Sequence, residues 1–135
     1  MDLRIYIDGA CRGNPGPSSI GVVILDGKGK PIKEHGRFLG EGTNNTAEFT
    51  ALIEALQLAL ELGARNLKIH SDSQLLVRQY SGEYKVKNER LAEFLGQIRD
   101  LRNRFTAVEL VHIPRELNRH ADRLANEALD SVGSD

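Results

Sequence analysis

Cysteine and tryptophan are scarce in this chain, which has one cysteine, Cys11, and no tryptophan among its 135 residues. A single cysteine excludes an intrachain disulfide and gives no sign of an oxidising compartment. The first residues lack the charged and then apolar layout of a secretion signal, and no apolar run approaches the roughly 18 residues that a membrane span needs. We therefore expect a cytoplasmic protein that does not associate with a membrane.

An excess of charge of either sign is also missing. Eighteen Lys and Arg residues and nineteen Asp and Glu residues give a formal net charge of −1. Dedicated nucleic-acid binders usually carry a basic excess, so this average argues weakly against that class. The balance changes if several carboxylates gather in one metal site, because the remaining surface is then net positive. Net charge alone leaves the partner undecided.

Strand and helix patterns follow one another within the length of a single domain. Strand patterns cover 3–8, 20–25, 31–40, 66–70 and 107–113, and a turn-rich loop covers 9–17. Helical spacing covers 45–62, 73–80 and 91–104, and a last helix is marked by Leu117, Ala121, Leu124, Ala125 and Ala128. This order predicts one α/β domain over 1–130, with helices packed on the faces of a mixed sheet, and a polar tail at 131–135.

Four acidic residues stand at or near the ends of these predicted elements. Asp8 ends the first strand and Asp72 follows the fourth, while Glu48 and Asp122 lie near the starts of two helices. Ends of neighbouring strands are close in space, so Asp8 and Asp72 would meet if their strands were adjacent. Gathered carboxylates repel one another unless a hard divalent cation such as Mg²⁺ neutralises them. Their joint placement therefore predicts a metal site.

Each of these acidic residues also has an ordinary structural explanation. Asp8 suits a turn, Asp72 suits the N-cap of the following helix, and Asp122 suits a solvated helix face. Glu48 suits a capping box at the start of its helix. The cap candidates there are Thr43, Asn44 and Asn45. Taken one at a time, the four residues do not decide between these explanations and a metal site.

Signatures of other catalytic classes are missing. The glycines of GNPGP (13–17) are not followed by Lys and then Ser or Thr, so the segment is no phosphate-binding loop. The four histidines lack the spacing of a zinc site, and no serine lies in a nucleophile elbow. Cys11 has no histidine placed by sequence to activate it.

Four segments together resemble the type 1 ribonuclease H family. They are IYIDGACRGNPGP (5–17), GTNNTAEFTALIEAL (42–56), IHSDSQLLV (69–77) and IPRELNRHADRLANEAL (113–129), in the family's order and spacing. The resemblance implies a five-stranded mixed sheet in the order 3-2-1-4-5, with the first three strands antiparallel and helices on both faces. That order places the first and fourth strands side by side, as the metal site requires.

The resemblance also implies a chemistry. By this resemblance, the catalytic residues of the chain would be Asp8, Glu48, Asp72 and Asp122. They would bind two Mg²⁺ ions, with Mn²⁺ as a substitute. Water attacks the RNA strand of an RNA/DNA hybrid in line and leaves 5′-phosphate and 3′-hydroxyl ends. Two alternatives stay open: the same site acting on double-stranded RNA or DNA junctions, and a non-catalytic nucleic-acid binding module. The family also implies a monomer.

Substrate contacts follow from the same resemblance. Asn14, Asn44 and Gln74 match positions that touch the minor groove, where A-form duplexes display 2′-hydroxyls. Thr43 matches a contact to a DNA phosphate. Two further residues of the substrate-facing loops are Cys11 and Asn45.

The chain departs from the family pattern in two places. Well-studied bacterial members carry a basic, tryptophan-bearing extension where this chain has only residues 81–88, so we expect a weaker grip on the hybrid, or one aided by a partner domain. Lys85 and Lys87 would remain as phosphate contacts. The family's mobile loop before the last helix often carries a histidine, whereas His112 here stays on a strand. We expect Arg115 to engage a phosphate in its place, with plain surface exposure as the alternative.

Overall fold

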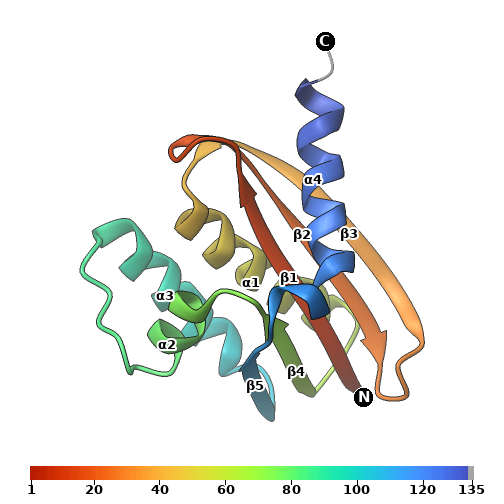
Figure 1. The fold of residues 1–135 in the computed structure, drawn as a ribbon. Helices are drawn as coiled ribbons and strands as arrows, with labels where there is room; N and C mark the ends of the chain where they lie inside the picture. The colour runs from red at the N-terminus through yellow and green to blue at the C-terminus, as the bar shows by residue number, and fades with distance from the viewer. Residues whose placement is uncertain (134–135) are drawn as a thin grey trace.

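Five strands of this chain pair into one mixed sheet, and helices cover both of its faces (Figure 1). The computed structural model describes residues 1–133. The strands are β1 (Asp2–Cys11), β2 (Gly16–Asp26), β3 (Pro31–Gly42), β4 (Asn66–Ser71) and β5 (Ala107–His112). The helices are α1 (Asn44–Glu61), α2 (Gln74–Tyr80), α3 (Glu89–Arg102) and α4 (Arg119–Gly133), with a 3₁₀ turn, η1, at Arg115–Leu117. Within the described range, no helix is both long and apolar enough to cross a membrane.

The strand order is β3-β2-β1-β4-β5, which confirms the order that the family resemblance implied. β1, β2 and β3 are antiparallel, whereas β4 runs parallel to β1 and β5 runs parallel to β4. The chain leaves β1 toward one side of the sheet and leaves β4 toward the other. Ligand sites of open α/β sheets lie at such a reversal, beside the carboxyl ends of the strands. Here that place is next to Asp8 and Asp72, because β1 and β4 pair up to Ile7 and Ser71.

Small residues let α1 and α4 lie close to opposite faces of β1 and β2. The face of α1 toward the sheet carries fully buried alanines four residues apart: Ala47, Ala51, Ala55 and Ala59. A Cβ at Gly9 would lie 2.5 Å from the backbone nitrogen of Glu48, and one at Gly21 would lie 2.0 Å from the backbone oxygen of Ala121 in α4. Gly21 is the pairing partner of Asp8. Both close approaches therefore flank Asp8, one on each face.

Alternating apolar residues of the strands build the core between the sheet and α1. Leu3, Ile5 and Ile7 of β1 are each at most 2% exposed, and α1 buries Leu52 and Leu56 against them. Burying one such side chain stabilises the fold by about 1.5–3 kcal/mol. Further apolar side chains from α3 and β4 join the same cluster, so this core fixes the place at which α1 begins.

β1 and β2 are longer than the sequence pattern predicts. The prediction ended the first strand at Asp8 and began the second at Ile20, whereas the pairing continues to Cys11 and Ser18 and leaves only residues 12–15 as the connection. Glycine and proline are typical of turns, and this led to the longer predicted loop. In the structure Gly9 lies within the strand and serves the close approach of α1. Asp8 is therefore not a turn residue.

The start and end of the last helix also differ from the prediction. Leu117 was placed on its buried face, but it lies in η1 and is 64% exposed, because α4 begins only at Arg119. α4 continues to Gly133, so the first three residues of the predicted tail are helical. Residues 134–135 lie outside the described residues. The domain boundary at residue 130 stays a prediction.

Candidate active site

Four different elements bring four carboxylates to one edge of the sheet. Asp8 lies in β1, Glu48 in α1, Asp72 directly after β4, and Asp122 in the first turn of α4. One carboxylate oxygen from each of Asp8, Glu48 and Asp72 lies within 4.8 Å of the other two. Asp122 borders the same cavity, and its negative charge also raises the pKa of Asp8. Residues that are far apart in the sequence are thus gathered as expected.

A cavity of about 340 Å³ opens over these carboxylates. Several of the predicted substrate residues line it together with the acids: Cys11, Asn44, Asn45 and Arg115. Asn14, Thr43 and Gln74 lie outside its lining. The cavity also takes in Ser73 and Asn126, which the sequence analysis did not single out. Its wall is predominantly polar, which suits a charged substrate rather than an apolar one.

Glu48 is free of the capping role that its position allowed. Thr43 is the N-cap of α1 and completes a capping box with Thr46, because each side chain bonds the other residue's backbone N–H. The Glu48 carboxylate instead accepts a hydrogen bond from the backbone N–H of Gly9 through Oε1. Its Oε2 is buried and has no hydrogen-bond partner among the described residues. The capping explanation of Glu48 is therefore wrong.

Asp72 does not cap a helix either. The N-cap of α2 is Ser73, whose hydroxyl accepts from the N–H of Leu76 at 3.2 Å. The Oδ2 atom of Asp72 accepts from the side-chain amide of Asn118 at 3.0 Å. Asp72 is thus left to face the other acids.

Asp122 is half-buried rather than on a solvated helix face. Its Oδ1 accepts a hydrogen bond from the amide of Asn126, one turn later, at 3.2 Å. Its backbone N–H donates to the carbonyl oxygen of Asn118 at 3.1 Å. Both asparagines act as donors toward the acidic cluster without adding charge to it.

Burial and mutual repulsion hold protons on this cluster. Burial, then the negative charges of Glu48 and Asp72, raise the pKa of Asp8 far above its ordinary value of 3.8. Burial also raises the pKa of Glu48, although the N–H of Gly9 opposes the shift. A divalent cation would replace those protons and satisfy the unpartnered Oε2 of Glu48. An all-oxygen donor set suits Mg²⁺, Ca²⁺ or Mn²⁺, so the residues fit such an ion.

The predicted substrate residues surround the cluster on exposed segments. The Oδ1 atom of Asn14 accepts from the backbone N–H of Asn44 at 3.1 Å, which joins the β1–β2 connection to the start of α1. Asn44, Asn45 and Gln74 are exposed. The Cys11 thiol donates to the carbonyl oxygen of Gly13 at 2.7 Å. Burial, then the charge of Glu41, raises the pKa of that thiol, which keeps it protonated and opposes a nucleophilic role.

Comparison with known proteins identifies the family to which this fold belongs. A family model described as reverse transcriptase-like matches residues 6–128. Ribonuclease HI of Halobacterium salinarum is 42% identical over 130 residues, which are 96% of this chain and 65% of that protein. The crystal structure of RNase H1 from the same organism matches with a TM-score of 0.95 at 40% identity, over 97% of this chain and 99% of that one. The chain belongs to the ribonuclease H family.

Two more ribonuclease H relatives bear on this chain. LC11-RNase H1, crystallised in complex with an RNA/DNA hybrid, matches with a TM-score of 0.92 at 44% identity, over 96% of this chain and 98% of that one. A bifunctional protein of Mycobacterium tuberculosis is 39% identical over 98% of this chain and 36% of its own length. This chain thus spans 65% and 36% of the Halobacterium and Mycobacterium proteins.

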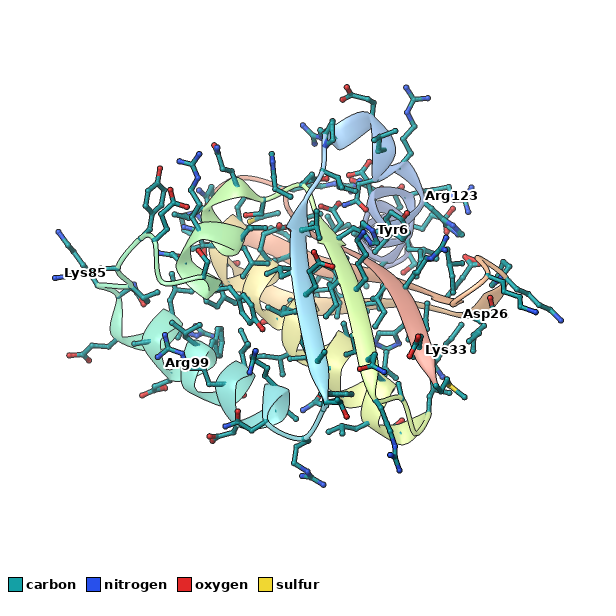
Figure 2. The ribbon with its side chains drawn as sticks, turned by 90° about the horizontal axis from the view of Figure 1, so that it is seen from below. Tyr6, Asp26, Lys33, Lys85, Arg99 and Arg123 are labelled. Carbon is teal, nitrogen blue, oxygen red and sulfur yellow. The ribbon has the colours of Figure 1, made fainter. Side chains whose placement is uncertain are left out.

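The connection between α2 and α3 and the segment before α4 are short, as the sequence predicts. α2 ends at Tyr80 and α3 begins at Glu89, so residues 81–88 form the whole connection. In Figure 2, Lys85 projects outward from this connection, and Lys87 is exposed as well. His112 is the last residue of β5 and is exposed. Arg115 lies in η1 at the cavity, and its side chain has no ion pair within residues 1–133.

Asn118 and Asn126 each donate a hydrogen bond to an acid of the cluster, and sequence reasoning missed both. Asparagine just before a helix is ordinarily explained as an N-cap, and asparagine within a helix as a surface residue. Only the spacing of Asn118, Asp122 and Asn126, four residues apart on one helix face, could have indicated that they act together.

Proposed function

We propose that this protein is a metal-dependent endoribonuclease that hydrolyses the RNA strand of RNA/DNA hybrids and leaves 5′-phosphate and 3′-hydroxyl ends. The observation that carries the proposal is the cluster of Asp8, Glu48 and Asp72, with oxygens within 4.8 Å of one another at the mouth of a polar cavity. A binder of polyanions has no reason to concentrate negative charge at its groove. The complex of LC11-RNase H1 with an RNA/DNA hybrid supports the choice of substrate.

The catalytic residues of the proposal are the four carboxylates, which would hold two Mg²⁺ ions, with Mn²⁺ as a substitute. When bound, such ions supply Lewis acidity and charge neutralisation to a phosphodiester group. The chain supplies the positioning: the N–H of Gly9 holds Oε1 of Glu48, and Asn118 holds Oδ2 of Asp72. Carboxylates that are already oriented need little reorganisation on binding, which is where much of the rate enhancement of such sites arises.

Polar side chains around the cavity would select and hold the hybrid. Asn14, Asn44 and Gln74 offer amide donors and acceptors for the minor groove, where 2′-hydroxyls distinguish RNA from DNA. Thr43 would contact a DNA phosphate. The two remaining residues of the proposed substrate surface are Cys11 and Asn45, which line the cavity.

Arg115 is the proposed phosphate ligand that replaces the loop histidine of the family. Its exposed guanidinium stands at the cavity without a carboxylate partner in the described part of the chain. Guanidinium groups bind phosphate oxygens through paired hydrogen bonds, which favours this role over plain exposure. A cytoplasmic location and a monomeric state remain predictions.

The decisive experiment offers labelled RNA/DNA, RNA/RNA and DNA/DNA duplexes to the protein with Mg²⁺ or Mn²⁺. We expect cleavage of the RNA strand of the hybrid alone, with loss of activity in EDTA and in Asp8→Asn. Asp100→Asn, at an exposed position of α3, is the matched control and should keep full activity. Phosphatase sensitivity of the fragments tests for the 5′-phosphate.

Three outcomes would contradict the proposal in different ways. Undiminished cleavage by Asp8→Asn would reject the metal-site assignment. Preferred cleavage of RNA/RNA or of DNA junctions would move the same site to another substrate. Tight hybrid binding without any cleavage would favour a non-catalytic module.

A further inference from the structure

Asn118 is almost completely buried beside the carboxylate cluster, at the junction of η1 and α4. It is 1% exposed. Its side-chain amide donates one hydrogen bond to the carbonyl oxygen of Ile7 at 2.8 Å and a second to Oδ2 of Asp72 at 3.0 Å. Both partners can only accept, so the nitrogen of the amide must face them. One side chain therefore links α4, β1 and the end of β4.

The backbone of Asn118 serves a further acid. Its carbonyl oxygen accepts from the N–H of Asp122 at 3.1 Å, in the first turn of α4. Ile7, which receives the side chain, directly precedes Asp8 in β1. Asn118 thus contacts the Asp72 side chain directly. It is also hydrogen-bonded to the backbone of Asp122 and to the backbone of Ile7, the residue before Asp8. A shift of this residue would change the placement of three of the four carboxylates.

The hydrogen bonding of Asn118 is not what helix stability alone would select. An asparagine just before a helix usually accepts an N–H of the first turn with its side-chain oxygen. Here Oδ1 is buried and has no partner within residues 1–133, an arrangement that costs free energy. A lysine or arginine would hold Asp72 too, but its charge would compete with a cation. A neutral amide orients the carboxylate and leaves its negative charge available.

We propose that Asn118 is a positioning residue that orients Asp72 for binding of a divalent cation. The proposal rests on the metal site of the proposed function and deepens it. Removing a hydrogen-bond partner of a ligand side chain typically lowers metal affinity about 10- to 100-fold. The same loss is expected here, because Asp72 would then be free to turn away from the other acids.

The first test measures Mg²⁺ and Mn²⁺ affinity of Asn118→Ala by calorimetry, on protein whose folding is checked by circular dichroism. Ser19→Ala is the matched control. Ser19 is fully buried and its hydroxyl donates to the carbonyl oxygen of Ala125, so its loss weakens the seating of the same helix without touching a carboxylate. We expect affinity about 10- to 100-fold lower in Asn118→Ala and unchanged in Ser19→Ala. Equal affinity in both variants would overturn the proposal.

A double-mutant cycle tests whether Asn118 acts through Asp72. In an Asp72→Asn background, Asn118→Ala should change the remaining cation affinity by less than about twofold, because the carboxylate it orients is gone. The same large loss in both backgrounds would show a general structural effect and reject the positioning role. With hybrid as substrate, Asn118→Ala should have a lower kcat than the wild type at low Mg²⁺. Excess Mg²⁺ should restore kcat, and the KM for the hybrid should stay unchanged.

If Asn118→Ala does not fold, the wild-type protein still decides the question. The side-chain amide protons of Asn118 should exchange slowly with solvent and change chemical shift on addition of Mg²⁺. Amide signals unaffected by saturating Mg²⁺ would contradict the proposal. A wild-type protein that binds Mg²⁺ but leaves hybrids intact would instead overturn the proposed function, since none of these binding measurements needs catalysis.

Discussion

Asp8 and Glu48 are the two buried acids of the cluster, and their burial affects how the metal-free protein responds to pH. Burial raises the pKa values of Asp8 and Glu48 above their ordinary values of 3.8 and 4.5. The folded state therefore holds protons that the unfolded chain has already released. The resulting loss of stability is absent below about pH 4 and grows as the pH rises through neutrality toward the raised pKa values.

Asp8→Asn should stabilise the metal-free protein while abolishing hydrolysis. The neutral amide needs no proton on folding, so it removes the cost of protonating a buried carboxyl group, a change we put at about 1–3 kcal/mol at pH 7.5. Thermal unfolding in EDTA should show a higher Tm than the wild type at pH 7.5 and nearly the same Tm at pH 4. A lower Tm at pH 7.5 would mean that Asp8 is stabilised by its neighbours, contrary to the raised pKa.

Arg115→Ala should lower kcat/KM for the hybrid at least about tenfold, equivalent to roughly 1.4 kcal/mol for the lost phosphate contact. Arg123→Ala is the control, because Arg123 projects from α4 into solvent and, among the described residues, forms an ion pair only with Glu127 in the next turn (Figure 2). Steady-state kinetics on both variants decides the matter. Unchanged turnover in Arg115→Ala would leave Arg115 as a plain surface residue.

At the scale of elements, the site depends on how closely α1 approaches β1. A Cβ at Gly9 would lie 2.5 Å from the backbone nitrogen of Glu48 and 2.6 Å from the carbonyl carbon of Ala47, and backbone atoms cannot move aside as a flexible side chain could. Gly9→Ala should therefore push the start of α1 away, destabilise the fold by about 1–3 kcal/mol, and weaken Mg²⁺ binding.

The matched substitution is Gly96→Ala, in the interior of α3. Apart from the backbone of its own helix, no atom of the described residues lies within 4 Å of the added Cβ, and alanine favours helix, so the change should stabilise the protein by about 0.5–1 kcal/mol. Urea unfolding curves and calorimetry on both variants provide the comparison. Equal effects at the two positions would refute the close-approach argument.

The order and kind of the elements could be predicted because apolar spacing records which face of each segment is buried. The extent of β1 and β2 could not, because glycines and prolines in 9–17 resemble a turn, and only their pairing partners show that Gly9 belongs to a strand. Leu117 was misplaced for a related reason. Its spacing fits the stripe of α4, but η1 interrupts the helix before Arg119.

Asp8 and Asp72 could be predicted to meet because the family resemblance placed their strands side by side, and the same resemblance added Glu48 and Asp122 to the group. The residues that hydrogen-bond each acid and orient it could not be predicted. Asn118 reaches Ile7, 111 positions away, and Asp72, 46 positions away, and such contacts exist only once the layers have packed. Capping rules, which consider only neighbours in sequence, allowed roles for Glu48 and Asp72 that Thr46 and Ser73 fill instead.

For the molecule as a whole, divalent cations should act as a stabilising ligand whose effect increases with pH. Mg²⁺ binds ionised carboxylates, so it must displace the protons that Asp8 and Glu48 hold. Those protons compete with Mg²⁺ more strongly at pH 5 than at pH 8. At 100 times its dissociation constant a ligand stabilises by about 2.7 kcal/mol. The rise in Tm on adding Mg²⁺ should therefore be larger at pH 8 than at pH 5 and be reversed by EDTA.

NaCl at matched ionic strength serves as the control for this measurement and should leave Tm nearly unchanged. A rise in Tm that is the same at both pH values, or one that Asp8→Asn retains in full, would place the bound cation elsewhere on the surface.

α4, which contributes Asp122 and packs on β1, β2 and β3, is the last of the described elements to leave the ribosome. While the chain is being made, Asp8, Glu48 and Asp72 emerge long before Asp122 and Asn118. A growing chain is then without the fourth acid and without the helix that packs on β1. Under the proposed function, the order of synthesis delays nuclease activity until the sheet has received its second layer, and a chain that stops short of Arg119 is expected to leave RNA/DNA hybrids intact.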